Sequence, residues 1–398
     1  MNRIYLSKPG LVTCAGLNSD ELWNSVTHGK QDGIKKVTAV SGDDFFAGRI
    51  DEDKIKPTTA RYDMRIHCIQ EMALNQIADE VAAAKEKYGA GRIAVCVGSC
   101  DNGTEFSVAG HKIFFETEKF AGDYSIEMQG ADYPSTFVKE KFALEGPCLS
   151  FSTACSSSAE AIIKGAQLLS SGMADAVIAG GVDIASDTVL LGFGALEAVS
   201  SEITNPFSAN RHGITLGEGA AFFVMTRVDD FKTGIGLLGY GESADAHHMT
   251  SPDPSGDGAM RAMEGALKSA GLKPSDIDYV NLHGTGTKLN DLMESKAVDA
   301  VFGEYKVAVS TTKPFTGHTL GAGSAVELAL CFEAIRKNRG ASNAVLPLQM
   351  WDGKKDEEIP SLNFVDKNNS GNCSKVKVCM SNSFAFGGSN CCLIVGEK

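Results

Sequence analysis

The chain has 398 residues, of which 43% are hydrophobic, and a formal net charge of −13. This length is sufficient for a large core in two domains or two related halves, and the negative charge argues against nucleic acid as a partner. No run approaches the roughly 18 apolar residues of a membrane span, and we expect no signal peptide. Since no secretion signal is expected, the 11 cysteines argue for a reducing cytoplasm instead of a disulfide framework, and their spacing does not predict a zinc site.

Predicted strands and helices alternate along the first part of the chain. In chain order they are a strand at residues 3–11, helices at 20–27 and 61–88, strands at 92–98 and 148–151, a helix after the latter, and strands at 176–182 and 220–225. Residues 99–138 are less regular and carry a cluster of aromatic side chains: Phe114, Phe115, Phe120, Tyr124 and Tyr133. We expect this segment to form a cap or an interface.

The same alternation restarts near residue 234. Helices are predicted at residues 260–270, 291–302 and 323–336, and strands at residues 279–282, 307–310, 376–380 and 391–395. This pattern predicts an α/β fold with mostly parallel strands. A faint internal echo, CSSSAEAIIKGAQLL against GAGSAVELALCFEAI, suggests two related halves. We therefore divide the chain at residues 1–232 and 233–398.

Cys155 lies in a tight turn between a short apolar strand and an amphipathic helix, in the sequence GPCLSFSTACSSSAEAIIKGAQLLSSG. A cysteine at a helix N-terminus is close to unpaired backbone N–H groups and to the positive end of the helix dipole. We therefore expect its pKa to lie below the ordinary value of about 8.5. The same N–H groups can hold an oxyanion beside the sulfur. On the turn alone, a small buried core cysteine is an equal alternative.

Two histidines downstream each follow a predicted strand. His283 begins a Gly/Thr loop, HGTGT, and His318 ends the segment KPFTGH, which begins with Lys313. Each histidine taken alone favours a structural role. Together with Cys155 they predict a site where a thiolate takes an acyl group and the imidazoles stabilise a second anion. A further stretch at residues 381–390, SNSFAFGGSN, is by itself a glycine turn between two strands.

These stretches resemble the β-ketoacyl-acyl carrier protein synthases, of the elongating type within the thiolase-like superfamily. The markers TACSSS, HGTGT, KPFTGH and SFAFGGSN occur in the family's order and at family-like spacing over nearly the whole chain. The resemblance implies a duplicated α-β-α-β-α layered fold. It also implies a decarboxylative Claisen condensation, which extends an acyl group by two carbons from malonyl carrier protein in fatty acid or polyene/polyketide-type biosynthesis.

The resemblance also implies roles for individual residues. Cys155 would accept the acyl group, His283 and His318 would stabilise the enolate after decarboxylation, and Lys313 with Glu327 would support the histidines. The other implied positions are Phe386, Phe384 and Asp245 for the oxyanion and for gating, Thr285 and Thr287 for pantetheine, and Asn281, Glu327, Ser381 and Asn382 for a structural cation described for some members.

This reaction implies no redox cofactor and no catalytic metal, because the acyl carrier protein brings its own phosphopantetheine arm. The expected partners are the carrier protein and a second subunit, either in a homodimer or in a heterodimer with a related ketosynthase-like subunit. Because the carrier protein is acidic, we expect a local basic dock, with five candidates: Arg61, Arg65, Lys112, Lys119 and Arg211.

Two departures from the family pattern bear on the substrate. Ala385 stands where glycine is usual, and its Cβ restricts the backbone, so we expect altered loop opening. Residues 99–102, near the implied acyl pocket, are more polar than a saturated chain would favour. We hypothesise a short, unsaturated or aromatic acyl substrate, as in specialised polyene synthesis.

Three other readings share parts of this pattern. A thiolase-like acyltransferase normally needs a second cysteine in the C-terminal glycine loop, and SFAFGGSN has none. A non-catalytic, chain-length-factor-like partner subunit usually lacks the nucleophile, whereas Cys155 is present. A cysteine hydrolase would let water release the acyl group, and the histidine pair with Lys313 favours condensation over it.

Overall fold

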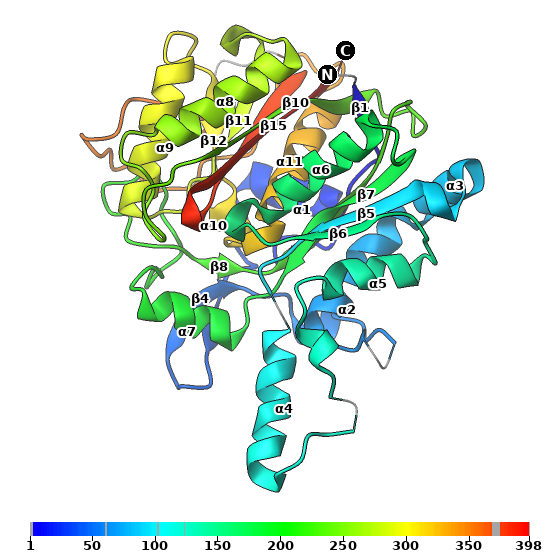
Figure 1. Cartoon of the computed structure of the whole chain (residues 1–398). Coiled ribbons are helices and arrows are strands. Elements are labelled where there is room, and N and C mark those ends of the chain that lie inside the picture. Colours follow the sequence, from blue (N-terminus) through cyan, green and yellow to red (C-terminus); the bar gives the residue numbers. More distant parts are fainter. Residues whose placement is uncertain (1–2, 60–61, 102, 123, 368–374, 398) are drawn as a thin grey trace.

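The computed structural model describes residues 3–59, 62–101, 103–122, 124–367 and 375–397. In these residues a 12-stranded mixed sheet runs through the molecule in the order β13-β12-β11-β14-β15-β10-β1-β9-β7-β5-β6, with β2 paired to β9. Strands β3, β4 and β8 form a small second sheet. Helices cover the large sheet, and α4 extends away from the rest of the molecule (Figure 1).

The first half contains these elements: β1 (Ile4–Leu6), β2 (Gly10–Thr13), α1 (Ser19–His28), β3 (Lys35–Thr38), β4 (Asp44–Gly48), α2 (Arg65–Leu74), α3 (Ala78–Tyr88), β5 (Ile93–Gly98), α4 (Thr104–Thr117), α5 (Tyr133–Lys141), β6 (Cys148–Phe151), α6 (Ser157–Ser170), β7 (Ala176–Asp183), α7 (Asp187–Ala195), β8 (Leu216–Gly217) and β9 (Gly219–Thr226). The second half contains these: β10 (Ile235–Ala244), α8 (Asp257–Ala270), β11 (Tyr279–Asn281), α9 (Lys288–Phe302), β12 (Ala308–Ser310), α10 (Lys313–Thr316), α11 (Gly323–Lys337), β13 (Asn363–Phe364), β14 (Val378–Phe384) and β15 (Ser389–Glu397).

The strand order repeats between the halves. The order β6-β5-β7-β9-β1 in the first corresponds to β12-β11-β14-β15-β10 in the second. In each set the first three strands are parallel and the next two are antiparallel. The antiparallel pairing of β1 with β10 joins the halves into one sheet. The predicted duplicated α/β architecture is therefore confirmed. The prediction of mostly parallel strands is wrong, because six of the 11 described pairings in this sheet are antiparallel.

Helices α6 and α11 occupy equivalent places in the two halves and pack together at the centre of the molecule (Figure 1). Helix α6 buries an apolar stripe with the predicted helical spacing, which includes Ile162, Ile163 and Leu169. Residues 323–335 of α11 are all buried, as expected of a helix that is apolar nearly all round. Because both helices begin at the same end of the sheet, their N-terminal turns meet.

Several predicted boundaries are wrong for local reasons. The strand predicted at residues 3–11 is two strands, β1 and β2, which both pair with β9 in registers that differ by one residue. The pairing is interrupted next to Pro9, which has no N–H to donate. The helix predicted at residues 61–88 begins at Arg65 and is interrupted by a 3₁₀ turn at Asn75–Ile77. Helix α4 lies in the segment predicted to be irregular, and α7 with the β3–β4 hairpin has no predicted counterpart.

Within the described ranges, every cysteine is a free thiol, as the composition predicted. The described helices include none that is long and apolar enough to cross a membrane.

Candidate active site

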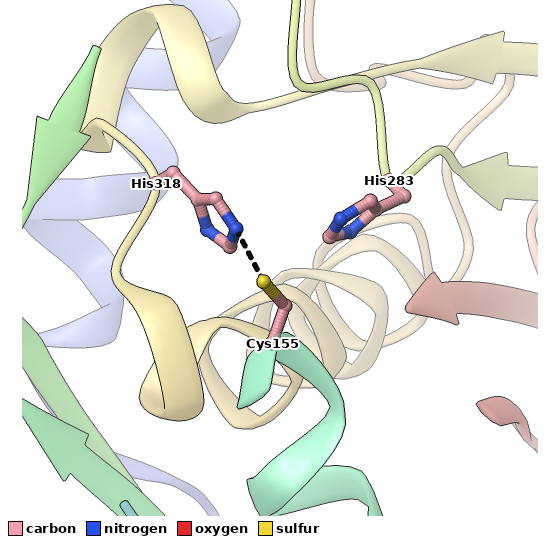
Figure 2. Close-up of side chains that lie close together, drawn as sticks. All are labelled: Cys155, His283 and His318. Carbon is pink, nitrogen blue, oxygen red and sulfur yellow. Dashed lines mark hydrogen bonds between the residues drawn. The ribbon is translucent and has the colours of Figure 1, made fainter. Parts of the chain in front are cut away.

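Cys155, His283 and His318 converge at the end of the sheet where α6 and α11 begin (Figure 2). The Cys155 Sγ and one ring nitrogen of each histidine all lie within 4.8 Å of one another, and all three residues are buried. The His318 Nε2 is 3.0 Å from the Cys155 Sγ. The rings of His283 and His318 are nearly perpendicular, with centroids 5.3 Å apart. The structure thus brings together three residues that are far apart in the sequence.

The two halves have equivalent turns, one that contains Cys155 and one that follows His318. Cys155 lies in a 3₁₀ turn at Ala154–Ser156 just before α6, and the 3₁₀ turn at Leu320–Ala322 precedes α11. Each turn contains a non-glycine residue with a left-handed backbone, Ala154 (φ 53°) and Leu320 (φ 50°). Such a conformation is uncommon and costly, so both turns are held by their surroundings.

The Cys155 thiol is neutral at physiological pH. Burial raises the pKa of Cys155 to about 11, against the opposing effects of the Lys313 cation and of the Phe386 N–H, which donates to the sulfur. The expectation of a lowered pKa is therefore wrong. The reason is that the sulfur is enclosed, and removing a thiolate from water outweighs the favourable groups near it.

The two histidines are neutral as well. Burial and the Lys313 cation hold the pKa of His283 and of His318 well below the ordinary range. The Lys313 ammonium lies 2.5 Å from the Glu327 Oε1 and 3.4 Å from the His283 Nδ1, and it also donates to the His283 carbonyl oxygen. Lys313 therefore contacts both His283 and Glu327 directly, whereas the predicted support of His318 stays a prediction.

A cavity of about 380 Å³ leads to the three residues. Thr285 and Thr287 lie on its wall with their hydroxyl oxygens 3.0 Å apart. Phe384 and Phe386 line the inner part, and the Phe386 ring is stacked near Phe193 at 5.9 Å. The cavity thus combines paired hydroxyls along its wall with aromatic rings beside the thiol.

Asp245 joins the cavity wall to the turn that carries Phe386. Its carboxylate accepts from the Asn390 side chain at 2.6 Å, and its N–H donates to the Gly388 carbonyl oxygen at 2.9 Å. In this turn Gly387 and Gly388 have φ of 83° and 79°, whereas Ala385 is extended (φ −96°). The Cβ of Ala385 therefore causes no backbone strain in this conformation.

Buried carboxylates that the sequence prediction missed hold the loops of the site. Glu294 accepts from the N–H groups of His283 and Gly284, each at 2.7 Å, and Asp183 accepts from the N–H of Gly321 at 2.5 Å. Burial raises the pKa of both carboxylates to about 7. A signal was available for each, since Asp183 ends an otherwise apolar strand and Glu294 lies inside the helix that follows HGTGT.

Of the four residues implied for a structural cation, three lie on two paired strands and Glu327 lies on α11. Asn281 is directly opposite Ser381 in the β11–β14 pairing. The Asn281 Oδ1 and the Ser381 Oγ are buried and have no hydrogen-bond partner. Asn382 and Glu327 are engaged elsewhere, with the Asn382 Oδ1 accepting from Cys392 at 3.2 Å. Two orphaned buried oxygens fit the coordination of a hard cation.

Two of the five candidate docking cations are not available at the surface. Arg65 forms a buried ion pair with Glu218, and Arg211 is 3% exposed and paired with Asp356. These two candidates are wrong, because Arg65 neutralises the buried Glu218 and Arg211 is itself buried beside the buried carboxylate of Asp291. Lys112 and Lys119 are exposed at α4 and just after it, and Arg61 lies outside the described residues.

Both halves of the chain match models of one protein family. Residues 9–230 match the model described as beta-ketoacyl synthase, N-terminal domain, and residues 236–344 match beta-ketoacyl synthase, C-terminal domain. The 3-oxoacyl-[acyl-carrier-protein] synthase 2 of Coxiella burnetii is 31% identical over 422 residues, which cover 99% of this chain and 98% of that protein. The protein of the same name from Staphylococcus aureus is 29% identical over 415 residues, covering 98% and 97%.

Solved structures give the same result. A chain in the complex of the ketosynthase ApeO with its chain length factor ApeC, from Xenorhabdus doucetiae, superposes with a TM-score of 0.91 and 36% identity. The superposition covers 100% of this chain and 98% of that one. A beta-ketoacyl synthase from Burkholderia phymatum superposes with a TM-score of 0.81 and 27% identity, covering 100% of both chains.

Proposed function

The chain belongs to the β-ketoacyl synthase family and is an elongating ketosynthase, and we propose that Cys155, His283 and His318 carry out its reaction. The observation that supports this assignment is the convergence of the thiol and two neutral imidazoles, within 4.8 Å, at the inner end of a cavity of about 380 Å³. A neutral histidine pair beside a nucleophile suits a reaction that forms two successive anions. Because Cys155 is present, a non-catalytic partner subunit is not favoured.

In the first half-reaction an acyl group moves from a carrier-protein thioester to Cys155. The His318 Nε2, 3.0 Å from the sulfur, takes the thiol proton as the sulfur attacks the thioester carbonyl. The N–H groups of Cys155 and Phe386 hold the oxyanion of the tetrahedral intermediate. Its collapse breaks the bond to the phosphopantetheine sulfur, which leaves with the proton, so both histidines are neutral again.

In the second half-reaction malonyl carrier protein takes the vacated place. His283, and His318 in the tautomer that carries its proton on Nε2, donate N–H bonds to the malonyl thioester oxygen, which accepts the electrons when the carbon–carbon bond breaks and carbon dioxide leaves. The resulting carbanion attacks the acyl carbonyl on Cys155, and the carbon–sulfur bond breaks. The products are a β-ketoacyl carrier protein two carbons longer and the Cys155 thiolate, which takes up one proton from solvent to restore the neutral thiol.

The other residues position the reactants. Thr285 and Thr287 bind the amides of the phosphopantetheine arm, and Phe384, Phe386 and Asp245 gate the inner cavity. No redox cofactor or catalytic metal is required, since the arm belongs to the carrier protein. A cation bound by Asn281 and Ser381, with Asn382 and Glu327 nearby, would supply fixed positive charge behind the histidines and stabilise the β11–β14 strand ends.

We further propose an unsaturated or aromatic acyl chain. Two adjoining cavities of about 610 and 270 Å³ share Met64 and Phe106 beneath α4. Their walls include the rings of Phe106 and Tyr124, stacked at 5.3 Å, and the carboxylate of Asp101. Flat rings suit a flat conjugated chain better than a flexible saturated one. Equal turnover of saturated and unsaturated acyl carriers of the same length, or a preference for the saturated one, would contradict this substrate class.

A second subunit is the proposed cover for α4. The helix and the chain after it expose large apolar side chains, among them Phe115 at 81% and Ile126 at 73%. Strand β6, at the edge of the sheet, lies in the same half and exposes Leu149. Since ApeO is bound to a chain length factor, a ketosynthase-like subunit is the partner that this surface fits best.

The experiment that tests the proposed function is intact-mass spectrometry. Wild-type protein and Cys155→Ala are each mixed with an acyl-loaded carrier protein, and malonyl carrier protein is then added. We expect one acyl adduct on the wild type, none on the variant, and discharge of the adduct as β-ketoacyl carrier protein. Absence of an adduct at every acyl length, with or without a ketosynthase-like partner, would overturn the proposal.

A further inference from the structure

Asp183 ends β7 with a side chain that is completely buried. Its Oδ1 accepts from the Ser99 hydroxyl at 3.0 Å and from the N–H groups of Cys100 and Asp101 at 3.0 and 2.9 Å. Its Oδ2 accepts from the N–H of Gly321 at 2.5 Å and also from that of Cys100 at 3.0 Å. One carboxylate therefore joins the loop after β5 to the turn before α11.

Both of these segments lie against the reacting residues. The Cys100 Sγ donates to the carbonyl oxygen of Ala154, the residue before Cys155, at 3.1 Å. Gly321 is three residues after His318 in a turn that contacts the turn of Cys155, and Ser324 of that helix start donates to the Cys155 carbonyl oxygen at 3.1 Å. Asp183 thus contacts Cys100, which bonds to the backbone before Cys155, and Gly321, which lies in the turn after His318.

The duplication of the fold gives this position a further meaning. The turn with Leu320 and Gly321 before α11 is the counterpart of the turn with Ala154 and Cys155 before α6. The N–H of Gly321 therefore corresponds to the N–H of Cys155, which we assign to the oxyanion. In the second half the Asp183 carboxylate fills that anion position permanently. A Cβ on Gly321 would lie 2.6 Å from the Asp183 Oδ2, so this approach requires glycine.

We propose that Asp183 is a positioning residue of the condensation site, whose carboxylate occupies the anion-binding turn of the second half and thereby fixes the backbone around Cys155 and His318. The inference rests on the proposed function of these two residues. Asp183 touches no reacting atom, and it acts through Cys100 and Gly321. A shift of these loops would misplace the attacking sulfur relative to its proton acceptor, and such misplacement is costly in rate.

Asp183→Asn separates this role from a contribution to stability. An amide keeps the size of the side chain but places an NH₂ group against N–H donors, so at least one of the two loops loses its acceptor. Burial is the main cause of the raised pKa of Cys155, and the negative charge of Asp183 adds to it, so its removal favours the thiolate whether or not Asp183 positions the site. A positioning role therefore predicts slower acyl transfer at an unchanged melting temperature. Simple loss of stability would instead lower the melting temperature and would also speed alkylation by exposing the buried thiol.

The experiment measures three quantities on full-length protein: the rate of Cys155 acylation by an acyl carrier protein, the iodoacetamide alkylation rate of Cys155 at pH 8.5, and the melting temperature. For Asp183→Asn we expect acylation to slow by about 10- to 100-fold. Alkylation should accelerate by about threefold, because a nearby negative charge has been removed. The matched control is Asp175→Asn, which removes a partly exposed carboxylate just before the other end of β7 and should leave both rates unchanged.

A folded Asp183→Asn protein with the wild-type acylation rate would overturn the proposal, whatever its alkylation rate. If that variant does not fold, Ser99→Ala removes one hydrogen bond to the same carboxylate. It should slow acylation by about two- to fivefold, and an unchanged rate would count against Asp183. Failure of the proposed function is distinguishable, because the wild-type protein would then not be acylated at all. Failure of the Asp183 proposal would instead leave the wild type acylated, with Asp183→Asn acylated at the same rate.

Discussion

At the scale of single residues, loss of the thiol proton from Cys155, the proposed nucleophile, depends on a neighbouring histidine more than on the dipole of its helix. The position of Cys155 at the start of α6 was predicted from the spacing of small and apolar residues. Its pKa was not, because burial of the sulfur is decided by segments that are distant in the sequence, including the turn with Phe386. With a pKa raised to about 11, the thiol needs a neighbouring proton acceptor, and the His318 Nε2 at 3.0 Å is placed to be one.

The first prediction concerns the alkylation of Cys155 as a function of pH. Because the pKa is raised to about 11, only about one thiol in a thousand is ionised at pH 8. The alkylation rate should therefore rise continuously up to at least pH 10, with no plateau near pH 8.5. Peptide mass spectrometry after timed iodoacetamide treatment measures this rate for Cys155. A plateau at neutral pH would indicate a stable thiolate–imidazolium pair and contradict the neutral resting state.

The second prediction concerns Lys313, whose cation lowers the pKa of both histidines. In Lys313→Met this effect is absent, so the imidazoles take up protons at higher pH than in the wild type. A protonated His318 cannot accept the thiol proton. The acid limb of the pH profile of acylation, where the rate falls as pH falls, should therefore lie at higher pH in the variant. The measurement is the single-turnover acylation rate between pH 5 and 8.

A surface lysine provides the control for this experiment. Lys164 is on α6, the helix that follows Cys155, and pairs with Glu242. Lys164→Met should leave the acid limb where it is. An unmoved acid limb in Lys313→Met, in protein with a wild-type melting temperature, would show that the histidines do not limit the rate through their protonation.

At the scale of elements, the proposed catalytic residues lie in turns and loops, and the helices and strands hold those turns in place. The order strand, turn, helix around Cys155 and around His318 was predictable from the sequence, since both turns are rich in small residues. The tertiary supports were not. Glu294 and Asp183 act through backbone N–H groups of loops that no local pattern connects to them. Helix α4 was missed because its aromatic and β-branched residues have only modest helix propensity.

The third prediction concerns the turn after β14. Gly387 has φ of 83° with no atom near the place of a Cβ, so Gly387→Ala should cost only backbone strain, about 1 kcal/mol of folding free energy. Ala385→Gly makes the opposite type of substitution, at an extended residue. It mainly increases the conformational entropy of the unfolded chain, so it should also destabilise the protein by roughly 0.5–1 kcal/mol. Chemical denaturation measures both differences.

The two variants should differ in catalysis. Because the Phe386 N–H faces the Cys155 sulfur, strain at the neighbouring Gly387 should slow acylation severalfold, whereas Ala385→Gly should leave the acylation rate close to that of the wild type. A large acceleration by Ala385→Gly would instead support the sequence-based expectation that the Cβ of Ala385 alters loop opening.

At the scale of the whole molecule, the duplication was recognisable from the restart of the strand–helix pattern near residue 234. The sequence could not reveal that β1 and β10 join the halves into a continuous sheet, because that pairing is between strands more than 200 residues apart in the chain. The exposed apolar surface of α4 was also beyond local patterns. An aromatic cluster in an irregular-looking segment is compatible with a core, a cap or an interface, and only the fold distinguishes them.

The last prediction tests whether α4 is covered by a second subunit. Phe115 is 81% exposed, and in a dimer it would be buried with its apolar neighbours. Phe115→Asp should therefore shift the protein from dimer to monomer in sedimentation velocity, or abolish co-purification with a ketosynthase-like partner. Val40→Asp is the matched control, since Val40 is 84% exposed beside the β3–β4 hairpin, far in sequence from α4. A Phe115→Asp protein that assembles as the wild type does would place the subunit contact elsewhere. Assembly lost equally in both variants would show that added charge, and not the α4 surface, causes the effect.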